Sequence, residues 1–276
     1  MIYLNDLRSE FISSTNRGAF KEYISHPFDV ENIDLFKAAV SQGYDDAKRT
    51  FSDISKFWTQ HSKDAFFGFI ANAIQDACQN PPEDFERWHR DLCKDTCNWL
   101  NTRGYNRSTF GQGQKIVNMA FKYLFCLKGA ENYPIFQQCH MPLDSFTLEW
   151  YKRFVWKRKN TSTPTLTGDD KWSNLSEEKY AGIANAIATA LKTAPEFVCN
   201  NQSVTLPEFP LFAEFYIWPE MQMHLSTEGF LFSFHKPNQA EKNDWKQKSV
   251  SAKLDTIKLC IDEYQQIHEK GSFAVK

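Results

Sequence analysis

The sequence predicts a mostly α-helical protein, and three observations support this fold class. Apolar residues recur at helical spacing, as Ile116, Met119, Tyr123 and Leu127 do. Clean alternation of apolar and polar residues, which is typical of half-buried strands, is scarce. The 276 residues include only 11 glycines and 11 prolines, which is a low content of turn residues for a protein of many short strands.

The elements can be predicted in order along the chain. Asn80-Pro81-Pro82 ends the first helix, because proline cannot continue one. Ser176, followed by two glutamates, is placed as the N-cap of a later helix. Helices are expected over 65–78, 84–103, 115–128, 146–156, 177–192 and 253–270, with breaks at 79–83, 160–170 and 237–244. The two strand signals, 214–218 and 230–234, are short and isolated.

Composition limits the class of protein. Hydrophobic residues make up 42% of the chain and aromatic residues 15%, which excludes intrinsic disorder because large rings are readily buried. No segment approaches the ~20 apolar residues of a membrane helix, and the N-terminus is not a secretory signal. The seven cysteines are odd in number and scattered, as reduced thiols would be. We therefore expect a cytoplasmic protein that makes no membrane contact.

No metal site is expected. Cys93 and Cys97 lie one helical turn apart, as two buried cysteines on one helix face would, and the chain has no Cys-x-x-Cys pair. The formal net charge of -2, taken alone, argues against a nucleic-acid partner. The charges are segregated, however: 103–128 and 151–159 are basic, while 83–95 and 169–178 carry many of the acids. The sequence therefore predicts a localised basic face.

The region 109–159 contains the motifs that indicate chemistry. Gly111-Gln112-Gly113-Gln114-Lys115 stands directly before an apolar helix. Two glycines allow a tight turn, and the free N–H groups of a helix start can bind an anion such as a DNA phosphate. The alternative is a plain helix–helix connection that needs glycines for its geometry. Lys115 lies in the first helical turn, where the helix dipole disfavours a cation, and this favours a functional role.

Two further segments follow. Asp144, in Pro142-Leu143-Asp144, is placed at the start of the next helix, where simple capping is the alternative to catalysis. The stretch 151–159 contains five basic residues, no acid and interleaved aromatic residues. That composition suits a nucleic-acid backbone, although a basic run is also common on a solvated face.

With these motifs the chain resembles the helix–hairpin–helix DNA glycosylases that remove 8-oxoguanine, and most of all the archaeal type. The family's hairpin pattern corresponds to Gly111-x-Gly113-x-Lys115, and its Pro-x-Asp motif to Pro142-Leu143-Asp144. Gln114-Lys115 and the 29-residue interval to Asp144 fit the archaeal arrangement. The resemblance covers about 50 residues, 109–159. Thr109-Phe110 stands where the family usually has Leu-Pro.

The resemblance implies a fold, a reaction and a set of site residues. It implies two helical subdomains flanking an active-site cleft, with Lys115 as nucleophile, Asp144 as its assistant, and β-lyase activity besides base excision. The partner would be DNA carrying a damaged or modified base, and a monovalent cation would bridge the hairpin and a phosphate. No other cofactor is expected. The DNA-backbone contacts would come from Gly111, Gln112, Gly113, Arg103, Arg107 and Lys157.

The expected organisation is one monomeric unit, 1–276. It comprises a hairpin and catalytic helix at about 96–128, an aspartate segment at about 140–159 and a C-terminal helical part at about 171–276. Candidates for the base pocket are Trp172, Trp218, Phe66, Phe67 and His140, and for each of them core packing or a structural role is the alternative.

Two other functions stay open. The enzyme could remove a different bulky base, such as a modified cytosine of phage DNA. The chain could also be a helical DNA-binding module without catalysis, which would bind DNA with steep salt dependence and release no base.

Overall fold

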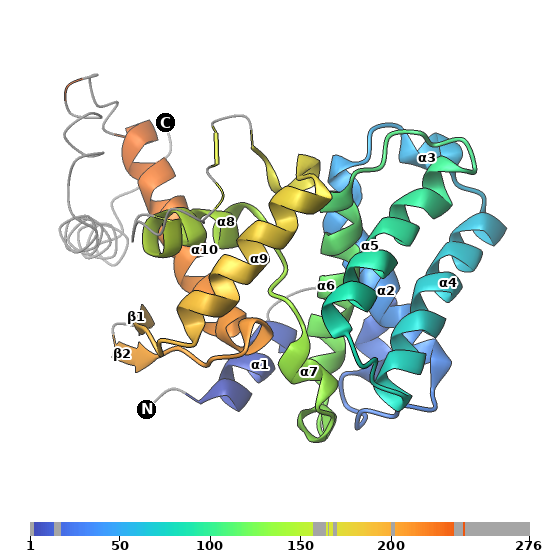
Figure 1. The fold of residues 1–276 in the computed structure, drawn as a ribbon, viewed down its shortest axis with the longest axis horizontal. Coiled ribbons are helices and arrows are strands. Elements are labelled where there is room, and N and C mark those ends of the chain that lie inside the picture. Colours follow the sequence, from blue (N-terminus) through green and yellow to red (C-terminus); the bar gives the residue numbers. More distant parts are fainter. Residues whose placement is uncertain are drawn as a thin grey trace, which may run out of the picture. The chain divides into compact units, whose positions relative to one another are not determined.

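The prediction of a mostly helical protein is confirmed by the computed structural model, which describes residues 3–13, 18–156, 164, 166–167, 170–199, 202–234 and 240 (Figure 1). The α-helices are α1 Leu4–Ser13, α2 Ile33–Ala47, α3 Ile54–Phe57, α4 Gln60–Gln79, α5 Phe85–Asn101, α6 Phe110–Phe125, α7 Ile135–Gln138, α8 Ser145–Trp150, α9 Glu177–Leu191 and α10 Pro210–Phe234. Shorter turns of 3-10 helix are Gly18–Tyr23, Lys48–Thr50, Ala130–Asn132 and Trp172–Asn174, and a π-helical turn, Tyr151–Val155, follows α8.

The contacts divide the chain into two compact units, residues 1–217 and 218–276. The first unit holds α1 to α9, the small sheet and the start of α10, and the second holds the remainder of α10. The expected C-terminal part began at about 171, whereas the boundary between the units lies inside α10.

The centre of the first unit is α6, which is buried along its length from Gly111 to Phe125. Helices α2 and α5 pack directly on it (Figure 1). Ile116, Val117, Ala120, Phe121 and Leu124 are wholly buried, and the helix as a whole is enclosed by its neighbours. Because α6 is enclosed in this way, any polar side chain on it must find a partner inside the protein.

Several predicted boundaries are confirmed. Helix α4 ends at Gln79, before the two prolines, and Ser176 caps α9 by accepting a hydrogen bond from the N–H of Lys179 at 3.2 Å. Cys93 and Cys97 are buried one turn apart on α5. The cysteines of the described residues are reduced thiols, namely Cys78, Cys93, Cys97, Cys126, Cys139 and Cys199.

The strand signals were wrong. Residues 214–218 and 230–234 both belong to α10, and the strands found are β1 Glu196–Cys199 and β2 Gln202–Thr205, which pair antiparallel. A short apolar run is common to buried helices and buried strands, so periodicity could not separate the two. The predicted helix 253–270 and Lys157 lie outside the described residues. Among the helices described, none is long and apolar enough to cross a membrane.

Candidate active site

Helix α6 begins with a capping box. The Thr109 hydroxyl accepts from the N–H of Gln112 at 3.3 Å, and the Gln112 side chain accepts from the N–H of Thr109 at 3.0 Å. The two reciprocal bonds satisfy backbone donors that a helix start otherwise leaves free. They fix the direction in which α6 starts, and therefore the place of Lys115 one turn later.

The two glycines of this turn allow close packing. A Cβ on Gly111 would lie 2.0 Å from the carbonyl oxygen of Trp172, and a Cβ on Gly113 would lie 2.4 Å from that of Cys93. The N–H of Gly111 donates to the Leu175 carbonyl at 3.1 Å, and those of Gln112 and Gly113 donate to the Thr109 carbonyl at 3.0 and 3.1 Å. All three N–H groups are thus used inside the protein. This geometry indicates that the two glycines serve close packing, and it does not favour a phosphate site at Gly111, Gln112 and Gly113.

The same turn does not fit the implied monovalent cation. The Thr109 carbonyl already accepts from two backbone N–H groups, and the Gly111 carbonyl accepts from the Gln114 side chain at 2.9 Å. Both carbonyl oxygens are therefore already hydrogen-bonded to donors within the protein.

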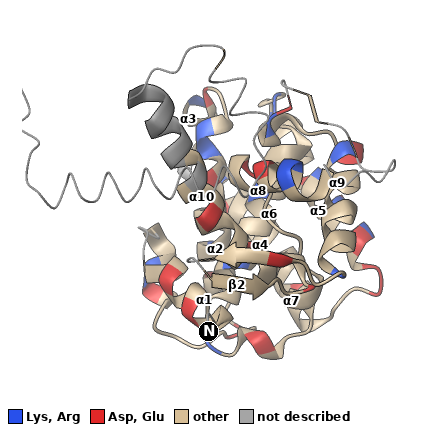
Figure 2. Ribbon diagram, turned by 90° about the vertical axis from the view of Figure 1, so that its left-hand side faces the viewer, with Lys and Arg blue, Asp and Glu red and all other residues tan. Residues whose placement is uncertain are grey.

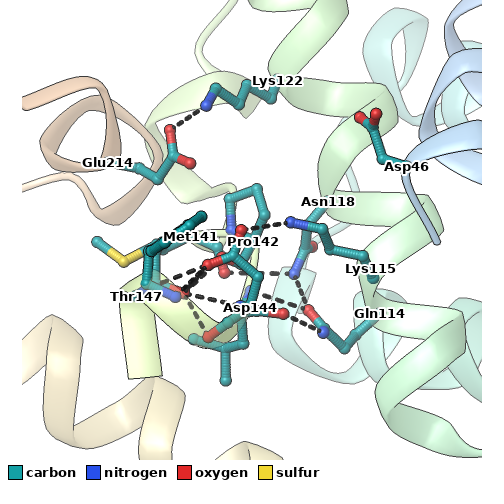
Figure 3. A network of polar contacts seen from close by, with 12 residues as sticks. Asp46, Gln114, Lys115, Asn118, Lys122, Met141, Pro142, Asp144, Thr147 and Glu214 are labelled. Atoms are coloured by element: carbon teal, nitrogen blue, oxygen red, sulfur yellow. Dashed lines mark hydrogen bonds and ion pairs between the residues drawn. The ribbon is translucent and has the colours of Figure 1, made fainter. Parts of the chain in front are cut away.

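Lys115 and Asp144, which are 29 residues apart in the chain, meet in the folded protein. The Lys115 Nζ lies 2.9 Å from Asp144 Oδ2, and the two side chains are 6% and 10% exposed (Figure 3). The Trp172 ring lies beside them, with its centroid 6.0 Å from the lysine nitrogen. A nearly buried ammonium and carboxylate at this distance form a charge-assisted hydrogen bond.

Asp144 also caps α8, as its position in the sequence indicated. Its Oδ1 accepts from the N–H groups of Phe146 and Thr147 at 2.9 and 3.1 Å, while the Thr147 hydroxyl accepts from the N–H of Asp144 at 2.8 Å. Capping and contact with Lys115 are therefore compatible, because they use different carboxylate oxygens.

A second buried ion pair lies on the same helix, and the sequence analysis did not identify it. Lys122 Nζ is 2.5 Å from Glu214 Oε2, and the two side chains are 2% and 1% exposed (Figure 3). Burial raises the pKa of Glu214, and the Lys122 ammonium opposes that rise. The available signal was Lys122 itself, a cation in an otherwise apolar helix seven residues after Lys115.

A polar chain leads from α6 to the surface. The Asn118 amide donates to the Tyr180 hydroxyl at 2.9 Å, and that hydroxyl lies 2.8 Å from His140 Nδ1. Burial raises the pKa of Tyr180 well above its usual value, so the hydroxyl stays protonated. His140 Nε2 then donates to Glu86 at 2.9 Å, a bond that holds the pKa of Glu86 below its ordinary value.

A cavity of about 500 Å³ lies beside this chain. His140, Met141 and Leu143 form one wall, together with the aromatic rings of Phe85 and Phe209. The residues lining it include four acids and one lysine, namely Glu83, Asp84, Glu86, Glu208 and Lys192. This acidic lining suits a DNA backbone poorly. His140 lies on the wall of this cavity.

The other predicted site residues fall into different environments. Arg103 is exposed and stacks on Trp99 at 4.0 Å, and Arg107 is exposed and lies 3.6 Å from Asp53. Phe66 and Phe67 are buried in α4, where their rings pack against Trp58, Trp99 and Tyr44. Both are therefore core residues. Trp218 belongs to the second unit. Trp172 lies next to Lys115, as the contact of its ring with the lysine nitrogen shows.

Within the described part of the chain, no group of three or more His, Cys, Asp or Glu side chains is arranged to hold a metal ion. Comparison of the chain with protein-family models, with curated proteins and with solved structures found no match.

Proposed function

We propose that this protein is a bifunctional DNA glycosylase and lyase, in which Lys115 is the nucleophile and Asp144 assists it. The observation that carries the proposal is the 2.9 Å contact between Lys115 Nζ and Asp144 Oδ2. Two residues selected from separate motifs, and implied by the resemblance to act together, lie in direct contact. The helix–hairpin–helix glycosylase fold, with two subdomains around a cleft, is part of the same proposal.

The reaction begins with proton transfer from Lys115 to Asp144, which frees the lysine electron pair to attack C1′ of an extrahelical nucleotide. The bond from C1′ to the base breaks, and the base leaves with the bonding electrons and regains a proton from Asp144. Once Asp144 has given this proton to the departing base, its carboxylate stabilises the positive charge on the sugar.

The second activity follows from the covalent bond. The lysine–sugar adduct opens to a Schiff base, loss of a proton from C2′ expels the 3′ phosphate by β-elimination, and water then frees the lysine. Because Lys115 is 6% exposed, a nucleotide reaches it only when neighbouring side chains move. The Trp172 ring lies beside Lys115, and an extruded base can stack on such a ring.

The substrate class is DNA with a modified base, and 8-oxoguanine is the first candidate by resemblance. We propose that the protein acts on DNA inside the cell as a monomer. Arg103 and Arg107, both exposed, would contribute backbone contacts on the side of the molecule that carries the loop after α5.

A base-release assay tests the proposal. Duplex and single-stranded oligonucleotides, each with one modified base, are incubated with the wild-type protein and with Lys115→Gln, and the free base is measured by chromatography. We expect release of 8-oxoguanine by the wild type and none by Lys115→Gln. Release of a modified cytosine instead would change the substrate and keep the reaction. DNA binding without release of any base would favour a non-catalytic binding module.

A further inference from the structure

Gln114, the residue before Lys115, is wholly buried and has all four of its hydrogen-bonding positions occupied. Its Nε2 donates to the carbonyls of Gly111 and Leu143 at 2.9 and 3.0 Å. Its Oε1 accepts from the Asn118 amide at 3.0 Å and from the N–H of Leu143 at 3.3 Å. A side-chain amide has two donor hydrogens and two acceptor lone pairs, so nothing is left unsatisfied.

The two bonds to Leu143 are the important ones. One amide side chain exchanges both a donor and an acceptor bond with the backbone of one residue, as two paired residues do in neighbouring strands. Such a two-point contact sets both the position and the direction of the segment that carries Leu143. In the sequence Gln114 is followed by Lys115, and Leu143 is followed by Asp144. The side chains of Lys115 and Asp144 are the two groups in contact at 2.9 Å (Figure 3).

Only an amide of this length makes the contact. Glutamate would lose both donors, and methionine would lose all four bonds, although each has a similar size. Asparagine is one methylene shorter. Asn118 holds the amide in place from the next helical turn, and its own oxygen accepts from His89 at 2.6 Å. Burial lowers the pKa of His89 well below its usual value, so this ring is neutral and donates one N–H.

We propose that Gln114 is a positioning residue that sets the register between Lys115 and Asp144. It touches neither substrate nor the reacting atoms, and it acts by fixing the Leu143 backbone relative to α6. The catalytic part of this inference rests on the proposed function, whereas the geometric part concerns the folded protein alone. The two parts can therefore be tested separately.

The geometric test uses urea unfolding and needs no DNA. A double-mutant cycle of Lys115→Met and Asp144→Asn measures the coupling between the two side chains. The cycle is repeated in the Gln114→Met background, where we expect the coupling to fall by more than about half because the partners lose their register. An unchanged coupling would overturn the proposal. Gln114→Asn replaces Gln114→Met if the latter does not fold.

The matched control is Gln112→Met. Gln112 is also buried on the first turn of α6, and its side chain donates to the Thr50 carbonyl at 2.8 Å. Among the residues that the structure describes, its side chain bonds to Thr109 and Thr50 and not to the aspartate segment. We expect Gln112→Met to lower the free energy of unfolding to a similar degree, while the coupling between Lys115 and Asp144 stays as in the wild type.

The catalytic test uses single-turnover base release. We expect Gln114→Met to slow base release about 10-fold or more in the wild-type background. In the Asp144→Asn background we expect it to slow release less than about 2-fold, because the residue through which Gln114 acts has already been changed. Equal slowing in both backgrounds would overturn the positioning role. If the wild type releases no base and the coupling still falls in the first test, the proposed function fails and the register inference stands.

Discussion

At the scale of single residues, the two oxygens of Asp144 have different partners. Oδ1 accepts from the backbone at the start of α8, and Oδ2 contacts Lys115. The first contact needs only a hydrogen-bond acceptor, which asparagine also provides. The second depends on negative charge. Structural and catalytic roles can therefore be separated by two substitutions at one position.

We expect Asp144→Asn to keep helix α8 and to reduce base release by about 10²-fold or more, since proton transfer to a positioned side chain contributes about 10²–10⁴-fold. Asp144→Ala should lose the cap as well, at a further cost of about 1 kcal/mol in the free energy of unfolding. Circular dichroism, urea unfolding and single-turnover assays measure these effects. Near-normal activity of Asp144→Asn would mean that Asp144 is only a cap.

At the scale of elements, α6 combines close packing with buried polar groups. Because Gly111 and Gly113 have no side chains, the 172–175 segment and α5 can approach the first turn of α6. The buried polar side chains of Lys115, Asn118 and Lys122 follow along the same helix. Each of these side chains has a partner on a different element, namely Asp144, Tyr180 and Glu214. The helix therefore determines how the surrounding segments are placed around the lysine.

Gly113→Ala tests the packing role. The added Cβ would lie 2.4 Å from the backbone oxygen of Cys93, so we expect a net loss of about 1–3 kcal/mol in the free energy of unfolding. Gly68→Ala is the matched control, because Gly68 also lies inside a helix but a Cβ added there would meet nothing within 4 Å. There we expect a gain of about 0.5–1 kcal/mol from helix propensity. A gain at both positions would contradict the packing account.

The Lys122–Glu214 pair leads to a pH prediction. Burial raises the folded-state pKa of Glu214 above its unfolded value, so the folded protein holds this proton to higher pH. The protonated Glu214 therefore contributes its full share to the free energy of unfolding at a pH below the pKa that Glu214 has in the unfolded chain. This contribution is lost as the pH rises through the pKa that Glu214 has in the folded protein. Wild type should therefore lose stability relative to Glu214→Gln as the pH increases from about 4. Urea unfolding of both proteins across the pH range measures the difference, and a constant difference would refute the prediction.

At the scale of the whole molecule, a net charge of -2 does not prevent DNA binding if the basic residues face the DNA locally. Figure 2 shows Lys and Arg positions interspersed with Asp and Glu positions over the described part of the chain. Lys48 and Arg49 precede α3, and Lys152 and Arg153 follow α8. With few phosphate contacts, the proposed glycosylase would bind undamaged DNA weakly and release it easily.

Arg103→Ala should weaken binding to duplex DNA and reduce the slope of log affinity against log salt by about 0.9, the value for one phosphate contact. Fluorescence anisotropy at several salt concentrations measures the slope. Lys37→Ala on α2 serves as control, because Lys37 is exposed and paired with Asp34 at 3.1 Å, away from the loop after α5. An equal change in slope for both variants would argue against a local contact at Arg103.

Much of the fold could be predicted from the sequence, because periodicity and caps such as Ser176 are local signals. The contact of Lys115 with Asp144 was anticipated through two motifs, but the role of Gly111 and Gly113 was not. Their packing depends on the 172–175 segment and α5, which approach in three dimensions only. The Lys122–Glu214 pair also could not be predicted, since residues 214–218 gave a strand signal and formed a helix instead.

The most direct test of the central claim is borohydride trapping of the Schiff base. Wild-type protein is incubated with a duplex that contains an abasic site, reduced with sodium borohydride, digested and analysed by mass spectrometry. The abasic site presents an open sugar, so the result does not depend on which base is recognised. We predict a covalent adduct on the peptide that contains Lys115 and its loss in Lys115→Gln. An adduct of undiminished yield in Lys115→Gln, or no adduct with the wild type, would contradict the role of Lys115 as the nucleophile.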